Sequence, residues 1–401
     1  MFNNMKFKVI FFGFIFTFFS SFGQSYFLGL FNSSIRDTLS ITHGQFGSIY
    51  ASATLFSSVL LIWVGKKIDD VNIFKFAIFV TILLAFACFF FSKISSILLL
   101  FIGIFLMRFS GQGMMSHTAS TTISRYFTKT RGRALSISWF GLSSAEFVLP
   151  VLMVYLLTLI NWQNLWLIFS ITVLVVLPIA SFLLIKNLKL ESREVSDKNI
   201  IEVEIKQWQR KEVIKDYRFY IISLNMLSMP WIFTGFAVFQ SFVQTSKGWG
   251  PYVIAQSFMS YSIFSVLTLF ISGFLIDKFT SRKLLIFMNI PLLFSVIILL
   301  FFDNPISAFV FLGLVGISNG FANILGSSTW AELYGVKYIG SIKALTTALM
   351  VFATAFGTAL FGFLIDIGFS VGDIAIVSGV YIFISLVLLF LIRNKLNPIL
   401  I

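Results

Sequence analysis

The sequence predicts an all-α integral membrane protein with twelve transmembrane helices in two pseudo-symmetric six-helix bundles. Of its 401 residues, 58% are hydrophobic and only 11% are charged, whereas soluble domains carry charge at roughly a quarter of their positions. The hydrophobic residues fall into windows of about 20, the length that crosses roughly 30 Å of hydrocarbon as a helix. Lipid offers the backbone no hydrogen-bonding partner, so each window must be helical.

Twelve apolar windows follow one another along the chain, separated by short polar gaps. In the first half we expect spans at 8–31, 45–65, 73–92, 95–120, 133–158 and 163–186. In the second half we expect spans at 218–245, 251–276, 282–302, 305–329, 340–365 and 371–392. The first window is longer than the core of a typical signal peptide and many spans follow it, so we interpret it as an uncleaved first helix.

The longest polar segment, 187–217, separates the two sets of six spans and carries charges of both signs. We therefore predict an N-terminal six-helix bundle over 1–186, a cytoplasmic linker over 187–217 and a C-terminal six-helix bundle over 218–401.

The Lys and Arg residues predict the orientation, because cytoplasmic loops carry the excess of positive charge. One set of alternate gaps holds only Arg36, Lys93 and Lys247, and Arg108 lies inside a span. Every other member of the 29 basic residues lies in or beside the opposite set of gaps, which we take as cytoplasmic. Both termini are then inside, and the compact chain with short loops suits the inner membrane of a bacterial cell.

An internal repeat supports two equivalent halves. Gly65 and Asp69 close the second span, and Gly273 and Asp277 close the eighth with the same spacing. Matching positions at the same end of corresponding helices indicate a duplicated six-helix unit.

With this pattern the sequence resembles the major facilitator superfamily over nearly its whole length. The two glycine–aspartate segments resemble that superfamily's signature between helices two and three and its echo between helices eight and nine. The segment Arg108–Gly113 is similar to its buried-arginine motif. The segments Arg125–Ala134 and Trp330–Gly335 resemble the branch of oxalate/formate antiporters and monocarboxylate carriers.

Several positions depart from the superfamily pattern. Asp70 stands where a basic residue is usual, and Asn72 and Thr280 stand where glycine is usual. The basic residue that many carboxylate carriers place deep in helix eight or eleven is absent, since Lys343 lies only at the start of helix eleven. An anionic substrate would therefore depend on Arg108 alone.

The repeated segments Gly65–Asp69 and Gly273–Asp277 are candidates for a conformational latch. Each aspartate is expected at the cytoplasmic end of a helix, where helices five and eleven present the positive ends of their dipoles. A carboxylate there could hold one half against the other in the outward-facing state. The alternative is a carboxylate that merely ends its span in water.

Two charges are expected deep in the membrane, where charges are costly and mark functional sites. Arg108 lies near the middle of helix four and Glu146 near the middle of helix five. Three interpretations stay open. Arg108 binds an anionic substrate through its planar guanidinium, Glu146 is a proton-coupling site, or the two form a permanent structural ion pair.

The resemblance implies that helices one, four, seven and ten line the transport path. Their polar and aromatic residues then become candidates for substrate binding, together with Arg108: Gln24, Tyr26, Gln112, Trp231, Gln240, Asn319 and Asn323. Asn319 and Asn323 are four residues apart and share one helix face. For each of these residues, hydrogen bonding between helices is an equal alternative. His117, lower on helix four, is expected to pack rather than titrate.

Several functional classes are excluded by what the sequence lacks. It has one cysteine, Cys88, and two histidines, His43 and His117, so we expect no metal site and no cofactor. It has no phosphate-binding G-x-x-x-x-G-K-[ST] loop. The net charge of +13 lies in the loops and reports topology rather than nucleic-acid binding. We expect no enzyme activity.

The resemblance implies a monomeric secondary transporter in the lipid bilayer that works by alternating access. We expect it to move a small organic anion, such as a monocarboxylate, together with protons. Efflux of a hydrophobic or cationic compound is the alternative, and a non-transporting membrane sensor is the alternative of another class. The sequence leaves substrate, direction and coupling ion open.

Overall fold

The computed structural model describes residues 4–127, 130–186, 188 and 206–398. Within these residues the chain forms helices and no strand, and twelve segments are long and apolar enough to cross a membrane. These spans are Met5–Gly29, His43–Asp69, Ile73–Phe91, Ile97–Tyr126, Gly132–Leu159, Trp162–Ile185, Tyr217–Val238, Val253–Ile276, Ser281–Phe301, Pro305–Tyr334, Ile339–Asp366 and Val371–Lys395. The predicted all-α fold with twelve transmembrane helices is confirmed.

The first six spans are built from helices that differ in continuity. They are α1 (Asn4–Ser20), η1 (Ser21–Gly23), α2 (Ser25–Gly29), α3 (Asn32–Leu39), α4 (His43–Gly65), η2 (Lys66–Asp69), α5 (Ile73–Phe91), α6 (Ile97–Met107), η3 (Arg108–Met115), α7 (Ser116–Tyr126), α8 (Arg131–Leu159) and α9 (Trp162–Ile185). The first span breaks at η1, a short 3₁₀ segment. The fourth span changes at η3 into a π-helix, a geometry often found at functional sites. Neither change was expected from the sequence.

The second six spans are mostly single helices. The remaining elements are α10 (Arg210–Val213), α11 (Tyr217–Val238), α12 (Gln240–Ser246), α13 (Val253–Phe279), α14 (Ser281–Phe301), α15 (Pro305–Tyr334), α16 (Ile339–Asp366), α17 (Val371–Ile392) and η4 (Arg393–Lys395).

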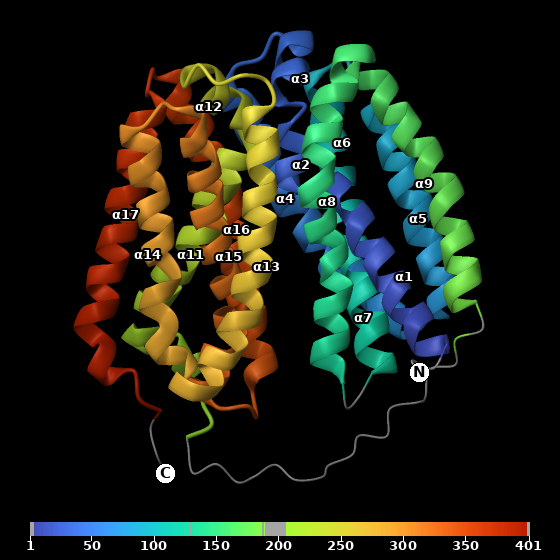
Figure 1. Cartoon of the computed structure of the whole chain (residues 1–401). Helices are drawn as coiled ribbons and strands as arrows, with labels where there is room; N and C mark the ends of the chain where they lie inside the picture. The colour runs from blue at the N-terminus through green and yellow to red at the C-terminus, as the bar shows by residue number, and fades with distance from the viewer. Residues whose placement is uncertain (1–3, 128–129, 187, 189–205, 399–401) are drawn as a thin grey trace. The chain divides into compact units, whose positions relative to one another are not determined.

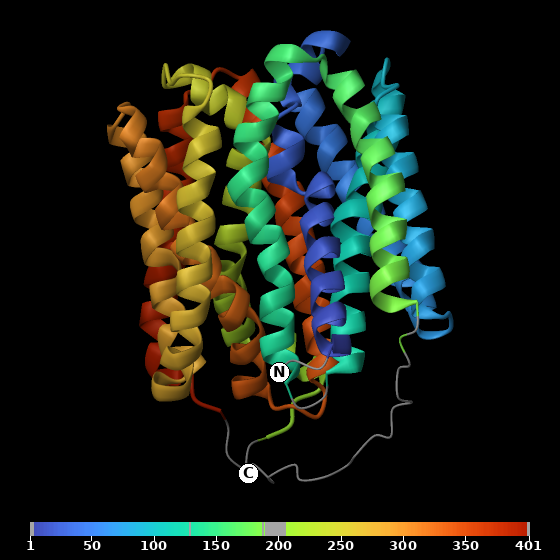
Figure 2. The same cartoon turned by 45° about the vertical axis from the view of Figure 1, so that its right-hand side comes forward.

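The chain divides into two compact units. Unit 1 comprises Met1–Arg193 with Ala237–Phe242, and unit 2 comprises Glu194–Phe236 with Val243–Ile401. In unit 1, α1 packs along α8, and α5 packs along α9 (Figure 1). In unit 2, α15 packs along both α13 and α14, and α17 packs along α14 (Figure 2). The linker predicted at 187–217 lies mostly outside the described residues, so its boundaries stay predictions.

Small residues allow the closest helix contacts, as membrane helices require. In unit 1, a Cβ at Gly141 of α8 would collide with the Phe14 carbonyl oxygen of α1. The Thr17 hydroxyl donates to the Ser138 carbonyl across the same contact at 2.6 Å. In unit 2, a Cβ at Gly316 of α15 would collide with the Tyr261 carbonyl oxygen of α13.

Side-chain caps satisfy the free backbone N–H groups at several helix starts. Thr42 and Gln45 form a capping box at the start of α4, and Ser370 and Asp373 form another at the start of α17. Asn72, a departure from the superfamily pattern, caps α5 by accepting hydrogen bonds from the Phe74 and Lys75 N–H groups. Its side-chain oxygen is what a glycine there would lack.

Candidate functional site

Arg108 begins the π-helix η3 and reaches the break in the first span. At Gln24 the backbone is extended (φ −81°, ψ 150°), which interrupts helical hydrogen bonding. Arg108 Nη1 donates to the Gly23 carbonyl oxygen at 3.0 Å and to Ser25 Oγ at 3.2 Å. The guanidinium also lies 5.4 Å from the centre of the Tyr50 ring. Arg108 is only 3% exposed, so these contacts hold a buried cation at the break.

Glycines bring the break and the π-helix together. A Cβ at Gly23 would collide with the Met107 carbonyl oxygen and the Gln112 backbone nitrogen. A Cβ at Gly111 would lie 2.6 Å from the Gly23 backbone nitrogen. The backbones therefore touch where Arg108 reaches across, and larger side chains at these two positions would separate them.

Glu146 lies in α8 and is 8% exposed. Among the described residues no hydrogen bond or ion pair joins its carboxyl to another group, and Arg108 is not its partner. Tyr26 of α2 lies within electrostatic range of this carboxyl. Unit 1 thus buries a cation, Arg108, that has several neutral contacts. It also buries an acid, Glu146, that has no hydrogen bond or ion pair among the described residues.

Gln240 makes contacts within unit 1, to which residues 237–242 belong. Its side-chain Nε2 donates to the carbonyl oxygens of Tyr26 at 2.7 Å and of Ala237 at 2.9 Å. Asn32 donates to the neighbouring Val238 carbonyl oxygen at 2.9 Å. The amide of Gln240 is therefore engaged in bonds between segments, and Gln24 and Gln112 lie half-buried beside Gly23 and Gly111.

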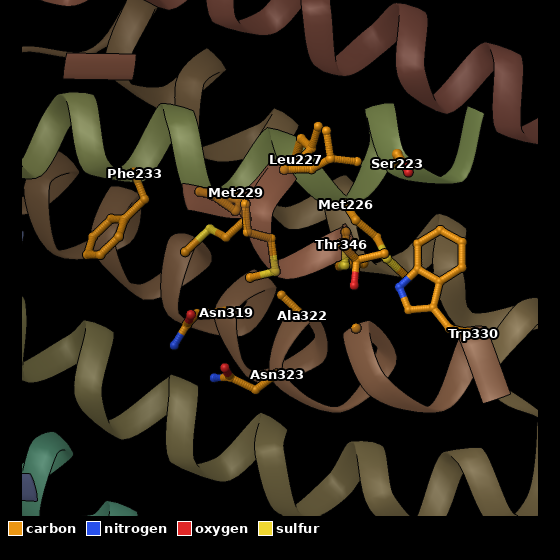
Figure 3. Close-up of a pocket in the computed structure, with 15 residues that line it drawn as sticks. Ser223, Met226, Leu227, Met229, Phe233, Asn319, Ala322, Asn323, Trp330 and Thr346 are labelled. Carbon is orange, nitrogen blue, oxygen red and sulfur yellow. The ribbon is translucent and has the colours of Figure 1, made fainter. Parts of the chain in front are cut away.

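Unit 2 contains a pocket of about 210 Å³ between α11, α14, α15 and α16. Asn319 and Asn323 lie on successive turns of α15 and both line it, as Figure 3 shows. Asn319 Nδ2 also donates to Ser265 Oγ at 2.9 Å. None of the described lining residues carries a charge, and the others are mostly apolar: Ser223, Met226, Leu227, Met229, Pro230, Phe233, Met288, Ala322, Gly326, Trp330, Thr346, Leu349 and Met350.

Among the candidates in unit 2, Trp231 does not line this pocket. Its ring packs edge-on against Tyr381, with centroids 5.2 Å apart, and against Phe361. The neighbouring residues Met229, Pro230 and Phe233 line the pocket instead. The methionines looked like ordinary apolar residues in the sequence, so nothing marked Met226, Met229, Met288 or Met350 as pocket residues.

The latch candidates of unit 1 make contacts inside that unit. Asp69 of η2 forms an ion pair with Arg125 at the end of α7. Arg125 also donates to the Ile68 carbonyl at 3.1 Å, and a His117 ring nitrogen lies 3.0 Å from the Gly65 carbonyl oxygen. These contacts join the turn between the second and third spans to the end of the fourth span. We call this turn the corner of unit 1.

Unit 2 has an equivalent corner with the charges exchanged. Arg282 Nε pairs with Glu332 Oε1 at 3.0 Å, which joins the start of α14 to the end of α15. Glu332 also accepts hydrogen bonds from the Ser281 N–H and hydroxyl, so it caps α14. Gly273 lies in α13, whereas the Asp277 side chain lies outside the described residues. Glu332 lies in the segment Trp330–Gly335, whose sequence did not indicate this role.

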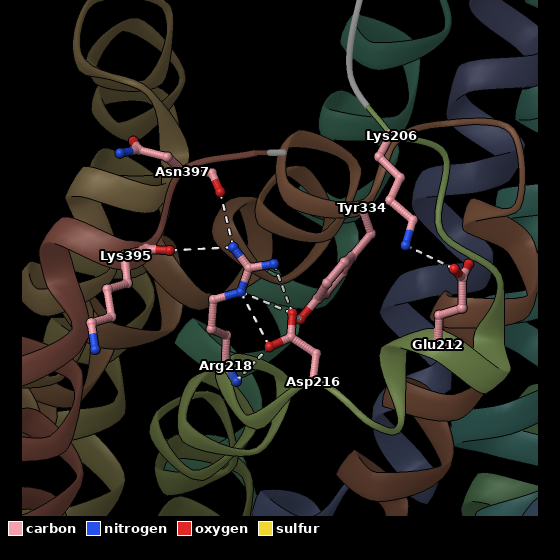
Figure 4. A network of polar contacts seen from close by, with 7 residues as sticks. All are labelled: Lys206, Glu212, Asp216, Arg218, Tyr334, Lys395 and Asn397. Carbon is pink, nitrogen blue, oxygen red and sulfur yellow. Dashed lines mark hydrogen bonds and ion pairs between the residues drawn. The ribbon is translucent and has the colours of Figure 1, made fainter. Parts of the chain in front are cut away.

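A buried polar network joins the start of α11, the end of α15 and the C-terminal segment of unit 2, as Figure 4 shows. Arg218 pairs with Asp216 at 2.8 Å, and Tyr334 donates to the same carboxylate at 3.1 Å. Arg218 also donates to the backbone carbonyls of Lys395 and Asn397. Nearby, the hydrogen bond from Lys206 lowers the pKa of Glu212 below its usual value. These contacts tie α11 and α15 to the C-terminal segment.

No metal site was found in the part of the chain that the structure describes, where no group of three His, Cys, Asp or Glu residues could hold an ion. Cys88 is buried in α5.

Comparisons with known proteins agree with the fold. A family model described as Major Facilitator Superfamily matches residues 13–358. A bacterial homologue of the human lysosomal transporter Spinster, solved inward-facing and unoccupied, has a TM-score of 0.73 and 13% identity over 98% of each chain. The nucleoside transporter NupG has a TM-score of 0.71 and 14% identity over 98% of this chain and 99% of its own. A search of curated proteins gave no significant match.

Proposed function

This chain belongs to the Major Facilitator Superfamily, so it is a secondary transporter and not an enzyme, and we propose that it moves a small, largely apolar organic compound by proton-coupled alternating access. The observation that carries this proposal is the chemistry of the unit 2 pocket. The described lining residues supply a few polar groups among methionines and aromatic rings, and none of them is charged. Such a site suits a compact apolar body that carries one or two hydrogen-bonding groups.

Asn319 and Asn323 are the proposed polar contacts to this compound. Each amide offers both donors and an acceptor, so together they can bind a carbonyl, hydroxyl or amide group. The methionines adapt their shape to different apolar bodies. The likeness to NupG supports the fold alone, but a nucleoside belongs among the compounds to be tested because its base and sugar combine the same two properties.

Glu146 is the proposed proton-binding residue. An ionised carboxylate is costly away from water unless it is paired. The described residues supply Arg108 with two hydrogen bonds and an aromatic ring, but they supply Glu146 with no such contact. The two groups therefore have different proposed roles. Arg108 holds the break in the first span, and Glu146 exchanges a proton during the transport cycle.

A second candidate is transport of a small organic anion, as in the oxalate/formate and monocarboxylate branch. The observation that favours it is the charge of Arg108, which has no carboxylate partner among the described residues. Its Nε also lacks a hydrogen-bond partner there. Gln24, Tyr26, Gln112 and Gln240, which belong to the same unit as Arg108, would line the surrounding path in this proposal. A carboxylate would have to reach Nε while Nη1 stays bound to Gly23.

The remaining proposals concern the setting. We propose that both termini lie in the cytoplasm, because most basic residues lie at the same end of the spans as the termini. We also propose that the chain is a monomer in the cell membrane.

A matched binding panel separates the two candidates. Purified protein is heated with compounds that share one apolar body and carry an amide, an amine or a carboxylate, and with a nucleoside. We expect the amide compound to raise the melting temperature of wild type and of Arg108→Gln, but not of Asn323→Leu. Asn164→Ala, which removes an exposed amide outside the pocket, is the control.

Stabilisation by the carboxylate alone, abolished in Arg108→Gln, would replace the first candidate with the second. A stabilising compound is then tested for saturable uptake into proteoliposomes with an imposed proton gradient. Absence of saturable flux in both gradient directions would contradict transport of that compound.

A further inference from the structure

A second concave site lies on unit 2, separate from the transport pocket. It is a groove of about 550 Å³ between α13 and α14. Leu275 and Phe279 line it from α13, Phe287 and Ile290 from α14, and Phe321 from α15. Its volume falls within the range of roughly 300–1,000 Å³ that is usual for bound organic molecules.

The packing of unit 2 explains the groove. α13 and α14 both pack closely along α15 but make few contacts with each other. Pro291 lies inside α14 and also lines the groove. Proline has no N–H and its ring crowds the preceding turn, which favours a bend in the helix. The two outer helices therefore form walls, and Phe321 of α15 lies between them.

The walls of the groove open toward the lipid side. Phe279 is 44% exposed and Phe287 is 54% exposed although both belong to membrane-spanning helices. Among the described lining residues, water in this groove would find a polar side chain only at Lys283. A lipid acyl chain entering it would instead gain dispersion contacts on three sides rather than the looser contacts of the bilayer.

The groove also has a charged end. Lys283, in the first turn of α14, lines it and is exposed, and no acidic residue among those described pairs with it. The adjacent Arg282 is already paired with Glu332. Lys278 lies over the ring of Phe279 at 5.3 Å, which places a second cation beside the same groove. Basic pockets between transmembrane helices are sites for anionic lipid head groups.

We propose that this groove binds one anionic phospholipid, with an acyl chain between α13 and α14 and the head-group phosphate at Lys283. The apolar walls supply general affinity for a chain, and Lys283 supplies the preference for negative charge. The site lies at the basic end of the spans, so the lipid belongs to the leaflet on that side. This inference is independent of the transported compound.

Lipid retention measured by native mass spectrometry tests the proposal. The full chain is purified with equal amounts of dioleoyl phosphatidylglycerol and dioleoyl phosphatidylcholine. We expect one retained phosphatidylglycerol in wild type. We expect Lys283→Gln to lower the preference for phosphatidylglycerol about fivefold, since one basic residue near the surface contributes about 1 kcal/mol. Lys395→Gln removes an exposed lysine elsewhere at this end and should leave the preference unchanged.

A groove-filling variant tests the acyl-chain part. Ile290→Trp should reduce retention of both lipids, with its folding checked by thermal unfolding. Added inorganic phosphate should not displace the lipid, whereas displacement by phosphate would indicate a simple anion site. An unchanged lipid preference in Lys283→Gln would overturn the proposal, even if Ile290→Trp failed to fold.

Discussion

Arg108 is held by neutral groups in a place where a carboxylate would be the usual partner. Its two hydrogen bonds, to Gly23 and Ser25, contribute about 1.5–3 kcal/mol each because the donor is charged. The Tyr50 ring adds about 2 kcal/mol for a desolvated cation. Together these are comparable with the several kcal/mol that burying one ion costs. Arg108 can therefore stay charged without Glu146, which leaves Glu146 available for a proton.

The first prediction concerns this carboxyl. Glu146→Gln keeps the shape and removes the ionisable group, so the variant should fold at least as stably as wild type. It should exchange substrate across proteoliposome membranes at a rate within about twofold of wild type, but should no longer accumulate it when a proton gradient is imposed. Both quantities are measured with the compound identified by the binding panel.

Glu212→Gln is the matched control, because Glu212 is a half-exposed acid outside the spans. Proton-driven accumulation that persists in Glu146→Gln at the wild-type level would exclude Glu146 as the coupling residue.

At the scale of elements, the join between the first and fourth spans is the most specific feature of unit 1. The 3₁₀ segment η1 interrupts one helix and the π-helix η3 interrupts the other, and the two interruptions lie against each other through Gly23 and Gly111. Each break frees backbone groups that a regular helix would use internally. Arg108 binds one of them, so the two irregular segments depend on each other.

Gly23→Ala should therefore disturb both spans. The added Cβ must push the Met107 carbonyl away, which we expect to destabilise the protein by about 1–3 kcal/mol, the usual range for overpacking. Thermal unfolding in detergent provides the measurement. Gly132→Ala, at a helical position with open space around it, should change stability by less than about 1 kcal/mol. Equal melting temperatures for the two variants would contradict a tight contact at Gly23.

The ion pairs Asp69–Arg125 in unit 1 and Arg282–Glu332 in unit 2 are the next features at this scale. Asp69→Asn breaks the ion pair with Arg125 and should slow transport by roughly fivefold, the change that about 1 kcal/mol in a barrier produces. Substrate affinity should remain within twofold, because Asp69 does not line the proposed pocket. Uptake rates and binding constants are compared with those of Asp70→Asn, an exposed neighbouring acid. Equal losses of rate and affinity would count against a latch.

At the scale of the whole molecule, hydropathy predicted each span to within a few residues at most ends. This succeeds because lipid forces every crossing segment to be helical and apolar. The breaks at Ser21–Gly23 and Arg108–Met115 were not predicted, since they arise from contact between segments far apart in sequence. Asn319 and Asn323 became candidates because the resemblance places helix ten along the transport path, and their spacing put them on one helix face. The methionines around them resemble lipid-facing residues until the fold is known.

Orientation in the membrane gives a prediction at this scale. In a Cys88→Ser background, a cysteine at Ser246 should react with a membrane-impermeant maleimide added to intact cells. A cysteine at Lys395 should react only after the membrane is opened. Both positions are exposed, so accessibility reports the side of the membrane rather than burial. The reverse labelling pattern would invert the predicted topology.

The contacts of Arg218 determine which substitutions the C-terminal segment tolerates. Arg218 holds the C-terminal segment through the carbonyl oxygens of Lys395 and Asn397, which every amino acid possesses. The side chains at these two positions can therefore drift freely over evolution while the fastening persists. Shortening the chain before Lys395 would instead remove both acceptors at once and leave a buried guanidinium with Asp216 as its main partner. Selection at this end of the molecule should thus act on length more than on sequence.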